Sequence, residues 1–386
     1  MPSPSQSAHQ QFIQCFKPYF WGNEANYVNE AIRDGWISSR GKFIESFERK
    51  FAEMVGVDHA VAVCNGTVAL HLALVALDIQ PGDEVIVPDF CMIAPIFAIL
   101  YCGAVPVPVE VDETWNISPD LIEAKITERT RAILVVHNYG HPARMDQISE
   151  IARRHGLCLI EDAAEALGAT VGDRKIGSFG DVSCFSLYAN KVITTGEGGM
   201  LVTNNAALCL TAQRKRDMNF GTTAETRYTH DEIGYNYRMT NLQAAVGVAQ
   251  IEHFEAAVNG KIEVARRYYA NLRDLPGLTL PPETAWGKNV FWTYGVVVNP
   301  EFGMSRAKLQ QSLYEAGIDT RRFFTPVHQQ PAVIRRGLVA AGADEFARSR
   351  SLSKHGLCLP SYLGLEAAEI DRISETIRKL AGRQPG

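Results

Sequence analysis

The chain has 386 residues, which is enough for a large domain with a smaller one or for two domains. Its composition, 46% hydrophobic and 21% charged, is that of an ordinary globular protein. The formal net charge of −5 argues against a general nucleic-acid-binding protein, which would carry a basic patch. The eight cysteines are scattered, without CxxC pairs or metal-ligand spacing. We therefore expect no metal site, and we interpret the cysteines as small buried side chains in a reducing compartment.

Two segments bear on localisation. Residues 1–20 begin with the polar stretch MPSPSQSAHQ, which lacks the basic-then-apolar layout of a signal peptide, so we expect a polar tail on a cytoplasmic protein. The run from Cys91 to Val109 has no charged residue and is nearly long enough to span a membrane. It is interrupted by Pro95, Gly103, Pro106 and Pro108. These breaks favour a buried helix, a turn and a strand instead.

The first 210 residues alternate apolar strands with helices. The apolar helix Ala69 to Leu77 follows the first strand, and a turn at Pro81-Gly82 precedes the second. The predicted strands are Val61–Cys64, Glu84–Pro88, Val105–Val111, Arg131–His137, Leu157–Glu161, Val182–Leu187 and Met200–Thr203. Most of them are continuous apolar runs, which indicate burial on both faces. The pattern predicts an α/β fold whose main sheet is largely parallel and covered by helices on each side.

The remainder of the chain predicts a smaller α+β domain. Thr240 to Asp274 is typical of one or two long helices, with Thr240 or Asn241 as the N-cap. Val290 to Asn299 is the strand that opens the C-terminal part. We predict a large domain over residues 21–260 and a smaller one over residues 261–386.

One lysine, Lys191, stands in an unusual setting. It lies in GSFGDVSCFSLYANKVITTGEGGM, Gly177 to Met200, after an apolar strand and before three glycines that allow tight backbone turns. Such a setting suits a lysine that holds pyridoxal phosphate (PLP) as a Schiff base. An ordinary lysine at the end of a strand would give the same local pattern.

A second stretch favours the cofactor. LCLIEDAAEALGA, Leu157 to Ala169, is an apolar strand that ends on Glu161 and Asp162. A PLP enzyme needs a carboxylate beside the pyridine nitrogen, which must stay protonated to act as an electron sink. Asp162 is placed to serve, although a strand-end acid can also cap a helix.

A third stretch, VAVCNGTVALHLAL, places Gly66 and Thr67 at a helix start, where free N–H groups and the helix dipole suit a phosphate. A plain strand-to-helix turn is the alternative. The chain has neither a GxGxxG after a strand nor a GxxxxGK[ST]. The sequence therefore does not predict a dinucleotide-binding site or a P-loop.

EDAAEALGA followed by GSFGDVSCFSLYANKVITTGEGGM resembles the DegT/DnrJ/StrS family of PLP-dependent sugar aminotransferases. The resemblance runs from about GWISSRGKFIESFE, near Gly35, to about CLPSYLGL, ending at Leu365. It implies the fold-type I architecture of aspartate aminotransferase. Within the family, SLYANKVITTGEGG, GYNYRMTNLQAA and FGMSR are most similar to the GDP-perosamine synthase branch.

The resemblance implies a role for each residue that matches a family motif. Gly66, Thr67 and Ser186 would bind the PLP phosphate, and Phe90 would stack on the pyridine ring unless it is an ordinary core residue. Glu165 stands where many members have glutamine, and its partner would be the cofactor hydroxyl. His137 and His141 look catalytic at first sight, but we expect them to shape the loop after a strand.

The resemblance also implies a homodimer with shared active sites, because Asn236 would reach the PLP phosphate of the neighbouring subunit. Arg321 and His328 match a family segment that ends Pro-x-His, and Arg40 lies in the turn SSRG. These three would contact the sugar or its diphosphate, although both segments could be solvated surface loops. Arg322 has no assigned role.

The resulting hypothesis is a transaminase in which Lys191 holds PLP and acts as general acid and base while Asp162 keeps the ring nitrogen protonated. The resemblance implies glutamate as amino donor and a nucleotide-linked 4-keto-6-deoxy sugar, GDP-4-keto-6-deoxymannose, as acceptor. A UDP- or dTDP-linked ketosugar is the alternative substrate. An NAD-dependent sugar oxidoreductase and a non-catalytic regulator of the same fold also stay open. The family contains dehydratases as well, in which a histidine replaces the lysine, so Lys191 argues against that activity.

Overall fold

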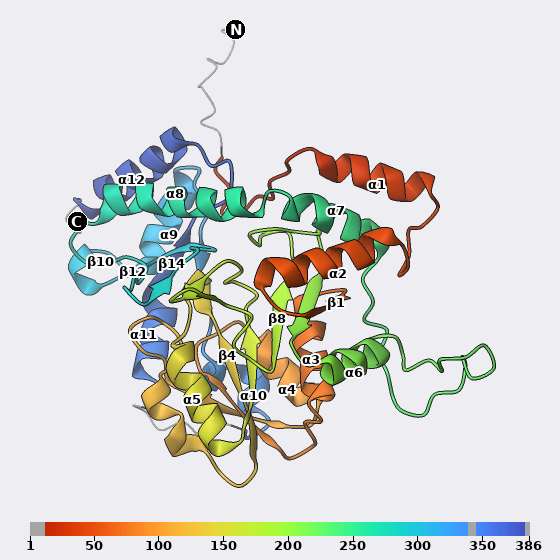
Figure 1. Ribbon diagram of the computed structural model, residues 1–386. Helices are drawn as coiled ribbons and strands as arrows, with labels where there is room; N and C mark the ends of the chain where they lie inside the picture. Colours follow the sequence, from red (N-terminus) through yellow and green to blue (C-terminus); the bar gives the residue numbers. More distant parts are fainter. Residues whose placement is uncertain (1–11, 339–344, 383–386) are drawn as a thin grey trace.

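The computed structural model describes residues 12–338 and 345–382, and a seven-stranded sheet lies at its centre (Figure 1). The strands lie in the spatial order β1-β9-β8-β5-β4-β2-β3. They are β1 (His59–Val63), β9 (Gly199–Thr203), β8 (Val182–Ser186), β5 (Cys158–Asp162), β4 (Thr130–Val136), β2 (Glu84–Pro88) and β3 (Val105–Val109). The neighbours from β8 to β3 pair in parallel, which confirms the predicted, mainly parallel sheet.

Strand β9 is the exception, because it pairs antiparallel with both β8 and β1. Only the segment from Leu187 to Gly198 separates β8 from β9. A parallel return is usually made by a crossover that contains a helix, and residues 187–198 form none, so the chain reverses here instead. Lys191 lies within that link.

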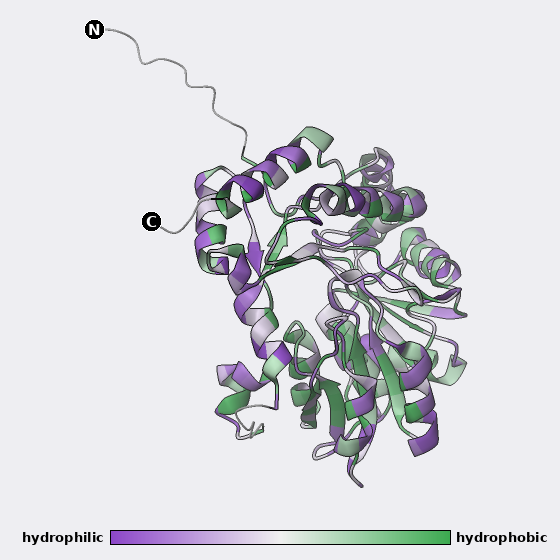
Figure 2. Cartoon of the chain, turned by 90° about the vertical axis from the view of Figure 1, so that its left-hand side faces the viewer, coloured by the Kyte–Doolittle hydropathy of each residue, from purple (hydrophilic) through white to green (hydrophobic). Residues whose placement is uncertain are grey.

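Helices cover both faces of the sheet, and each face has its own apolar core. Strand β4 shows the division, since Ile133 and Val135 belong to one core while Ala132 and Leu134 belong to the other. The first core contains residues of α2 (Lys42–Val55), α5 (Met145–His155), α7 (Asn241–Ile251) and the start of α8 (Phe254–Leu272). The second contains residues of α3 (Gly66–Ala76), α4 (Ala94–Tyr101) and α6 (Ala206–Arg216). Figure 2 shows hydrophobic residues along the strands and hydrophilic residues on the outward sides of the helices.

Helix α8 links the large sheet to a third core. Its early residues, including Val258, pack on the first core, while Val264 to Leu272 belong to the third. The third core covers a four-stranded antiparallel sheet, β10 (Leu278–Thr279), β12 (Tyr294–Val298), β14 (Gly356–Leu359) and β13 (Arg321–Arg322). The helices of this C-terminal part are α9 (Arg306–Glu315), α10 (Pro331–Ile334), α11 (Ala347–His355) and α12 (Ala367–Ala381). The chain therefore passes between cores within α8, near the predicted boundary at residue 260.

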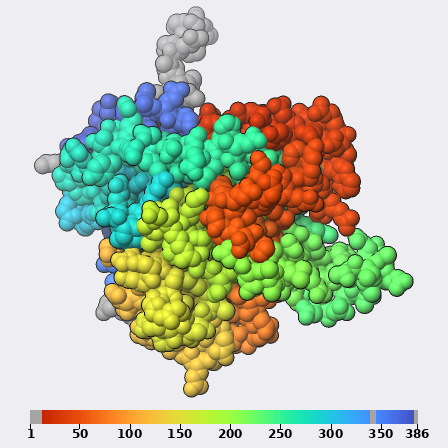
Figure 3. All heavy atoms as spheres, in the orientation of Figure 1, coloured from red at the N-terminus to blue at the C-terminus, as the bar shows by residue number. Residues whose placement is uncertain are grey.

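Smaller elements complete the fold. A three-stranded sheet consists of β11 (Gly287–Lys288), β6 (Thr170–Val171) and β7 (Arg174–Lys175). Helix α1 (Asn23–Arg33) packs on α7, and the loop from Asp217 to Thr240 projects from the body (Figures 1 and 3). Short 3-10 helices lie at Pro119–Leu121, Glu123–Lys125, Asn138–Gly140, Pro300–Phe302 and Val327–Gln329.

The uncharged run from Cys91 to Val109 folds as helix α4, a turn and strand β3, as its breaks predict. None of the helices in residues 12–338 and 345–382 combines the length and apolar character that a membrane span requires.

The predicted N-terminal tail divides in two. Residues 1–11 lie outside the described residues. Beyond them, Ile13 and Cys15 are buried, and Ile13 forms a parallel bridge with Ile318 of the C-terminal part. The segment from Phe12 to Phe20 thus has a defined course along the C-terminal part of the molecule.

Candidate active site

The predicted cofactor residues gather at one edge of the main sheet. Strands β8, β5, β4 and β2 are parallel, so their carboxyl ends lie at the same edge. Asp162 ends β5, Ser186 ends β8, and Gly66 follows β1, which is antiparallel to β9 and therefore runs with β8. Ligands of open α/β sheets bind outside the carboxyl ends of the strands, and this edge fits that rule.

Lys191 is held in a nearly dry position in the link between β8 and β9. Its side chain is 12% exposed, and Nζ lies 4.0 Å from Oε1 of Glu165 and 3.9 Å from the ring centre of Trp292. The indole N–H of Trp292 donates to the carbonyl of Asn190 (2.8 Å). Burial lowers the pKa of Lys191, while the charges of Glu165 and Asp162 act to raise it. A buried lysine with a lowered pKa suits an amine that must be deprotonated to react.

Asp162 has a carboxylate oxygen that is free to accept a hydrogen bond from a cationic group. It is buried, and its Oδ1 accepts one hydrogen bond from the N–H of Ala164 (3.1 Å). Within the part of the chain that the structure describes, Oδ2 accepts none. Burial raises the pKa of Asp162, and the Ala164 N–H and the charge of Lys191 offset this in part. A pyridinium N–H beside the free oxygen would stabilise the ionised carboxylate.

Glu165 is the second buried carboxylate of the site. Its Oε2 accepts the N–H of Tyr139 (2.8 Å), while Oε1 faces Lys191. Burial raises the pKa of Glu165 to about 7, although the charge of Lys191 acts to lower it. The site therefore holds a group that can carry or release a proton near neutral pH.

Gly66, Thr67 and Ser186 lie together as an anion site requires. Helix α3 begins at Gly66, and its N-cap Asn65 accepts the N–H of Val68 (3.0 Å). The N–H groups of Gly66 and Thr67 have no intrahelical acceptor, because they belong to the first turn. A Cβ at Gly66 would lie 2.9 Å from Cβ of Ser186, so only glycine lets the helix start approach this serine. Together these groups fit a phosphate.

Phe90 occupies a different environment from the one expected for a stacking ring. It has no exposed surface and packs against Tyr139, Phe323 and Phe324, with ring centres 6.0 to 6.2 Å apart. This is the packing of a core phenylalanine, which was the alternative for this residue. Stacking on the cofactor remains a prediction.

The two histidines have structural partners. His137 accepts the N–H of Ala143 at Nδ1 (3.1 Å) and contacts Glu161 through Nε2 (3.2 Å). His141 Nδ1 lies 2.8 Å from the carbonyl of Pro142. Burial lowers the pKa of His141 to about 4. Both residues therefore fix the loop after β4, in agreement with the sequence prediction.

A pocket of about 530 Å³ opens beside Asn190 and Trp292, next to Lys191. Arg321 and Arg322 line it, and Arg321 forms an ion pair with Asp319. The sequence motifs indicate no role for Arg322, and they do not indicate that Trp292 and Tyr139 belong to the site. An aromatic run, NVFWTYG, was the only signal for Trp292, and it does not reveal a contact with a lysine 101 positions earlier.

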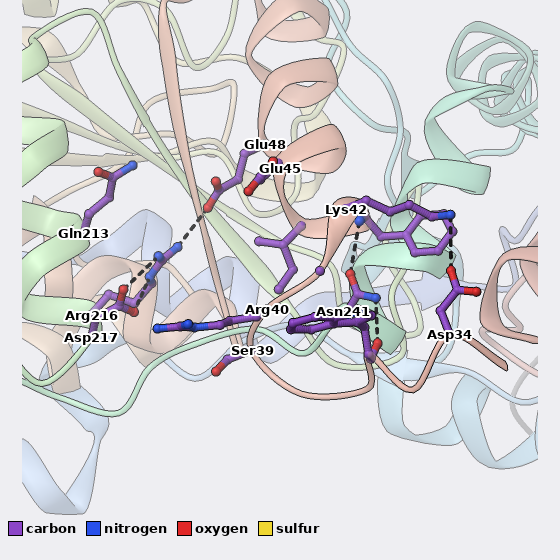
Figure 4. A pocket seen from close by; sticks show the side chains of 14 residues that line it. Asp34, Ser39, Arg40, Lys42, Glu45, Glu48, Gln213, Arg216, Asp217 and Asn241 are labelled. Atoms are coloured by element: carbon purple, nitrogen blue, oxygen red, sulfur yellow. Dashed lines mark hydrogen bonds and ion pairs between the residues drawn. The ribbon is translucent and has the colours of Figure 1, made fainter. Parts of the chain in front are cut away.

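The other predicted residues, Arg40, Asn236 and His328, do not line the pocket beside Lys191. Arg40 lines an open pocket of about 1030 Å³ whose described lining includes neither Lys191 nor Arg321, and Figure 4 shows its side chain extending toward Arg216 and Asp217. Asn236 is exposed, and its Oδ1 accepts from Arg238 (3.0 Å). His328 is buried, with Nδ1 2.7 Å from Oδ2 of Asp89.

The geometry fits PLP: an amine with a lowered pKa, a buried carboxylate with one free oxygen, and a helix start next to a serine. Among residues 12–338 and 345–382, no cluster of three His, Cys, Asp or Glu side chains could hold a metal ion.

Comparison with known proteins agrees with this site. Residues 20–378 match the model of the DegT/DnrJ/EryC1/StrS aminotransferase family. A GDP-perosamine synthase of Caulobacter vibrioides is 44% identical over 363 residues, covering 94% of this chain and 96% of the relative. One from Vibrio cholerae is 41% identical over 367 residues, covering 95% and 98%. The crystal structure of S. venezuelae DesV in complex with a ketimine intermediate superposes with a TM-score of 0.87 at 36% identity, covering 94% of this chain and 95% of that one.

These matches confirm the fold class, the PLP cofactor and the transaminase activity that the sequence predicts. The chain belongs to the DegT/DnrJ/EryC1/StrS family of PLP-dependent aminotransferases.

Proposed function

We propose that this aminotransferase moves an amino group from glutamate to GDP-4-keto-6-deoxymannose and forms GDP-perosamine. The observation that carries the proposal is the identity of 41% and 44% with two GDP-perosamine synthases over nearly the whole chain. The pocket beside Lys191 supports it, because its arginines suit a substrate with two phosphates.

Bound PLP supplies an electron sink and carries the amino group between donor and acceptor. Lys191 would hold this cofactor, and its Nζ would accept the proton from the α-carbon of the amino donor. The same amine returns a proton when the ketosugar is the substrate. Burial, which lowers its pKa, raises the fraction of Lys191 that is neutral and able to act as a base.

The remaining residues of the site would bind and orient the cofactor or cover Lys191. Asp162, whose Oδ2 accepts no hydrogen bond within the described chain, would keep the ring nitrogen of the cofactor protonated. The N–H groups of Gly66 and Thr67, with the Ser186 hydroxyl, anchor the phosphate. Trp292 covers Lys191 and excludes water from its amine, since Nζ lies 3.9 Å from the ring centre.

We further propose a cytoplasmic homodimer whose active sites are completed by the partner subunit. Asn236 is exposed and pairs with Asp217 at the base of the loop from Asp217 to Thr240, which projects from the body (Figure 3). Large hydrophobic side chains are exposed on this loop and in the segment before Ser38: Tyr228 and Ile233 are each 79% exposed, and Trp36 and Ile37 are 56% and 51% exposed. Burying such residues favours association.

The decisive experiment is a substrate screen. Purified PLP-loaded enzyme receives glutamate and one of three 4-keto-6-deoxy sugars, linked to GDP, dTDP or UDP. We expect the highest kcat/KM with the GDP-linked sugar, and Arg321→Ala should weaken turnover of all three because the diphosphate is common to them. A clear preference for the dTDP or UDP sugar would overturn the assignment of the GDP-linked sugar as substrate. No turnover with any of the three sugars would favour a regulator of the same fold.

A further inference from the structure

The N-terminal segment from Phe12 to Pro18 forms part of the wall of the pocket beside Lys191. Its backbone is fixed to the loop before β13: the N–H of Ile13 donates to Gly317 O (2.8 Å) and the N–H of Asp319 donates to Ile13 O (2.9 Å). The N–H of Cys15 then donates to the Asp319 side chain (3.4 Å). Asp319 is also the ion-pair partner of Arg321, so the segment and the arginine loop are one unit.

The segment also touches the ring that covers the reactive lysine. Phe16 stacks on Trp292, with ring centres 5.8 Å apart and planes inclined by 15°. Lys17 and Pro18 follow directly and line the same pocket as Arg321 and Arg322. A residue near the start of the chain is thus brought to the mouth of the site.

The cationic side chains of this pocket differ in whether they already have an ion-pair partner. Its lining within the described chain includes three cationic residues, Lys17, Arg321 and Arg322, and no aspartate or glutamate. Arg321 is partly neutralised by Asp319. Lys17 and Arg322 have no ion pair or side-chain hydrogen bond within residues 12–338 and 345–382. Two unpaired cations in one pocket favour an anionic ligand, and a volume of about 530 Å³ has room for a sugar and its phosphates.

We propose that Lys17 and Arg322 bind the diphosphate of the nucleotide-linked sugar and thereby place its keto carbon at Lys191. This assignment rests on the proposed function, since it takes a nucleotide sugar to be the substrate. The N-terminal segment is then a specificity element, because it delivers Lys17 and orders the loop that carries both arginines.

The test uses Lys17→Ala and Arg322→Ala, with Lys17→Arg as the conservative variant. Lys308→Ala is the control, since Lys308 is exposed on α9 and absent from the pocket lining. The affinities of PLP-loaded protein for GDP and for inorganic pyrophosphate are measured by calorimetry. Each alanine variant should bind GDP about tenfold or more weakly, as expected for a lost charge-assisted hydrogen bond. Lys17→Arg and Lys308→Ala should bind it nearly as the unmodified protein does.

The same variants should raise KM for the nucleotide sugar more than KM for glutamate, because only the sugar carries a diphosphate. GDP and pyrophosphate affinities that stay unchanged in Lys17→Ala and Arg322→Ala would overturn the assignment. An equal rise of both KM values would also overturn it, since it would indicate a general disturbance of the site. A wild-type enzyme that binds GDP and pyrophosphate through these cations but aminates no GDP sugar would refute the proposed substrate alone.

Discussion

Lys261 is a buried charge that the proposed chemistry does not use, and it makes a quantitative prediction possible. It lies on α8 with 4% of its surface exposed, and within the described chain no carboxylate pairs with it. A cavity of about 20 Å³ beside it has room for one water molecule. Burial lowers its pKa from 10.5 to about 7, with a small opposing effect of Cys15. We predict that Lys261→Met, which replaces the ammonium by an uncharged, unbranched side chain one atom shorter, stabilises the protein.

The sign and the magnitude of the change in the free energy of unfolding follow from proton linkage. The pKa is lower in the folded state than in the unfolded state, so the unfolded chain binds more protons between pH 7 and 10.5, and the free energy of unfolding rises with pH in that window. Integration between the two values gives a cost of the buried lysine of about 4 kcal/mol at pH 7 and about 2 kcal/mol at pH 9. The methionine variant should therefore gain about 2 kcal/mol more at pH 7 than at pH 9.

Urea unfolding at both pH values, at one protein concentration and with saturating PLP, measures this difference. Lys308→Met is the matched control, because Lys308 is exposed and should change stability by less than about 0.5 kcal/mol at either pH. A gain for Lys261→Met that is the same at pH 7 and pH 9 would refute the titration argument. No gain at either pH would show that the ammonium is solvated in place.

Three further predictions concern catalysis. Lys191→Ala should fold, lose the covalent link to PLP seen as a visible absorbance band, and lose turnover; normal turnover would remove Lys191 from the mechanism. Asp162→Asn should lower kcat by at least about a hundredfold, the usual effect of removing one electrostatic contact at a reacting centre, and an unchanged kcat would mean that another group faces the ring nitrogen. Mixing inactive Lys191→Ala and Asn236→Ala subunits should restore part of the activity, because a mixed dimer has one site with both native groups; a fully active monomer in sedimentation would contradict the shared site.

The sequence predicts the sheet and the setting of Lys191 between two strands because both depend on local signals. Continuous apolar runs marked the buried strands, and the glycines after Lys191 marked a tight link between strands. The long run from Thr240 to Asp274 was also interpreted as helical, and the structure divides it into α7 and α8. These features need only the spacing of apolar residues and the conformational freedom of glycine.

Contacts between distant segments could not be predicted. His328 was expected either to contact the substrate or to lie in a solvated loop, but its side chain is 6% exposed and pairs with Asp89, 239 positions away. Phe90 lies in a cluster whose buried aromatic members, Phe90, Trp115, Tyr139, Trp292 and Phe323, come from five separate parts of the chain. Propensity and periodicity describe one element at a time, whereas side chains meet through the tertiary packing of several, so such neighbours become visible only in the folded chain.

The adjacent acids at the end of β5 differ in whether an oxygen of the side chain is free for a further hydrogen bond. Successive side chains of a strand point to opposite faces, so Glu161 and Asp162 enter different environments. Glu161 is saturated, since it contacts the His137 ring and accepts hydrogen bonds from the Gly177, Phe179 and Gly180 N–H groups and the Ser183 hydroxyl. Although burial acts to raise the pKa of Glu161, these contacts hold it below its ordinary value. The side chain of Asp162 accepts a single hydrogen bond within the described chain, and burial raises its pKa. A carboxylate with satisfied oxygens stabilises the fold, whereas one with an unsatisfied oxygen can stabilise an incoming pyridinium, and of these two acids Asp162 meets that condition.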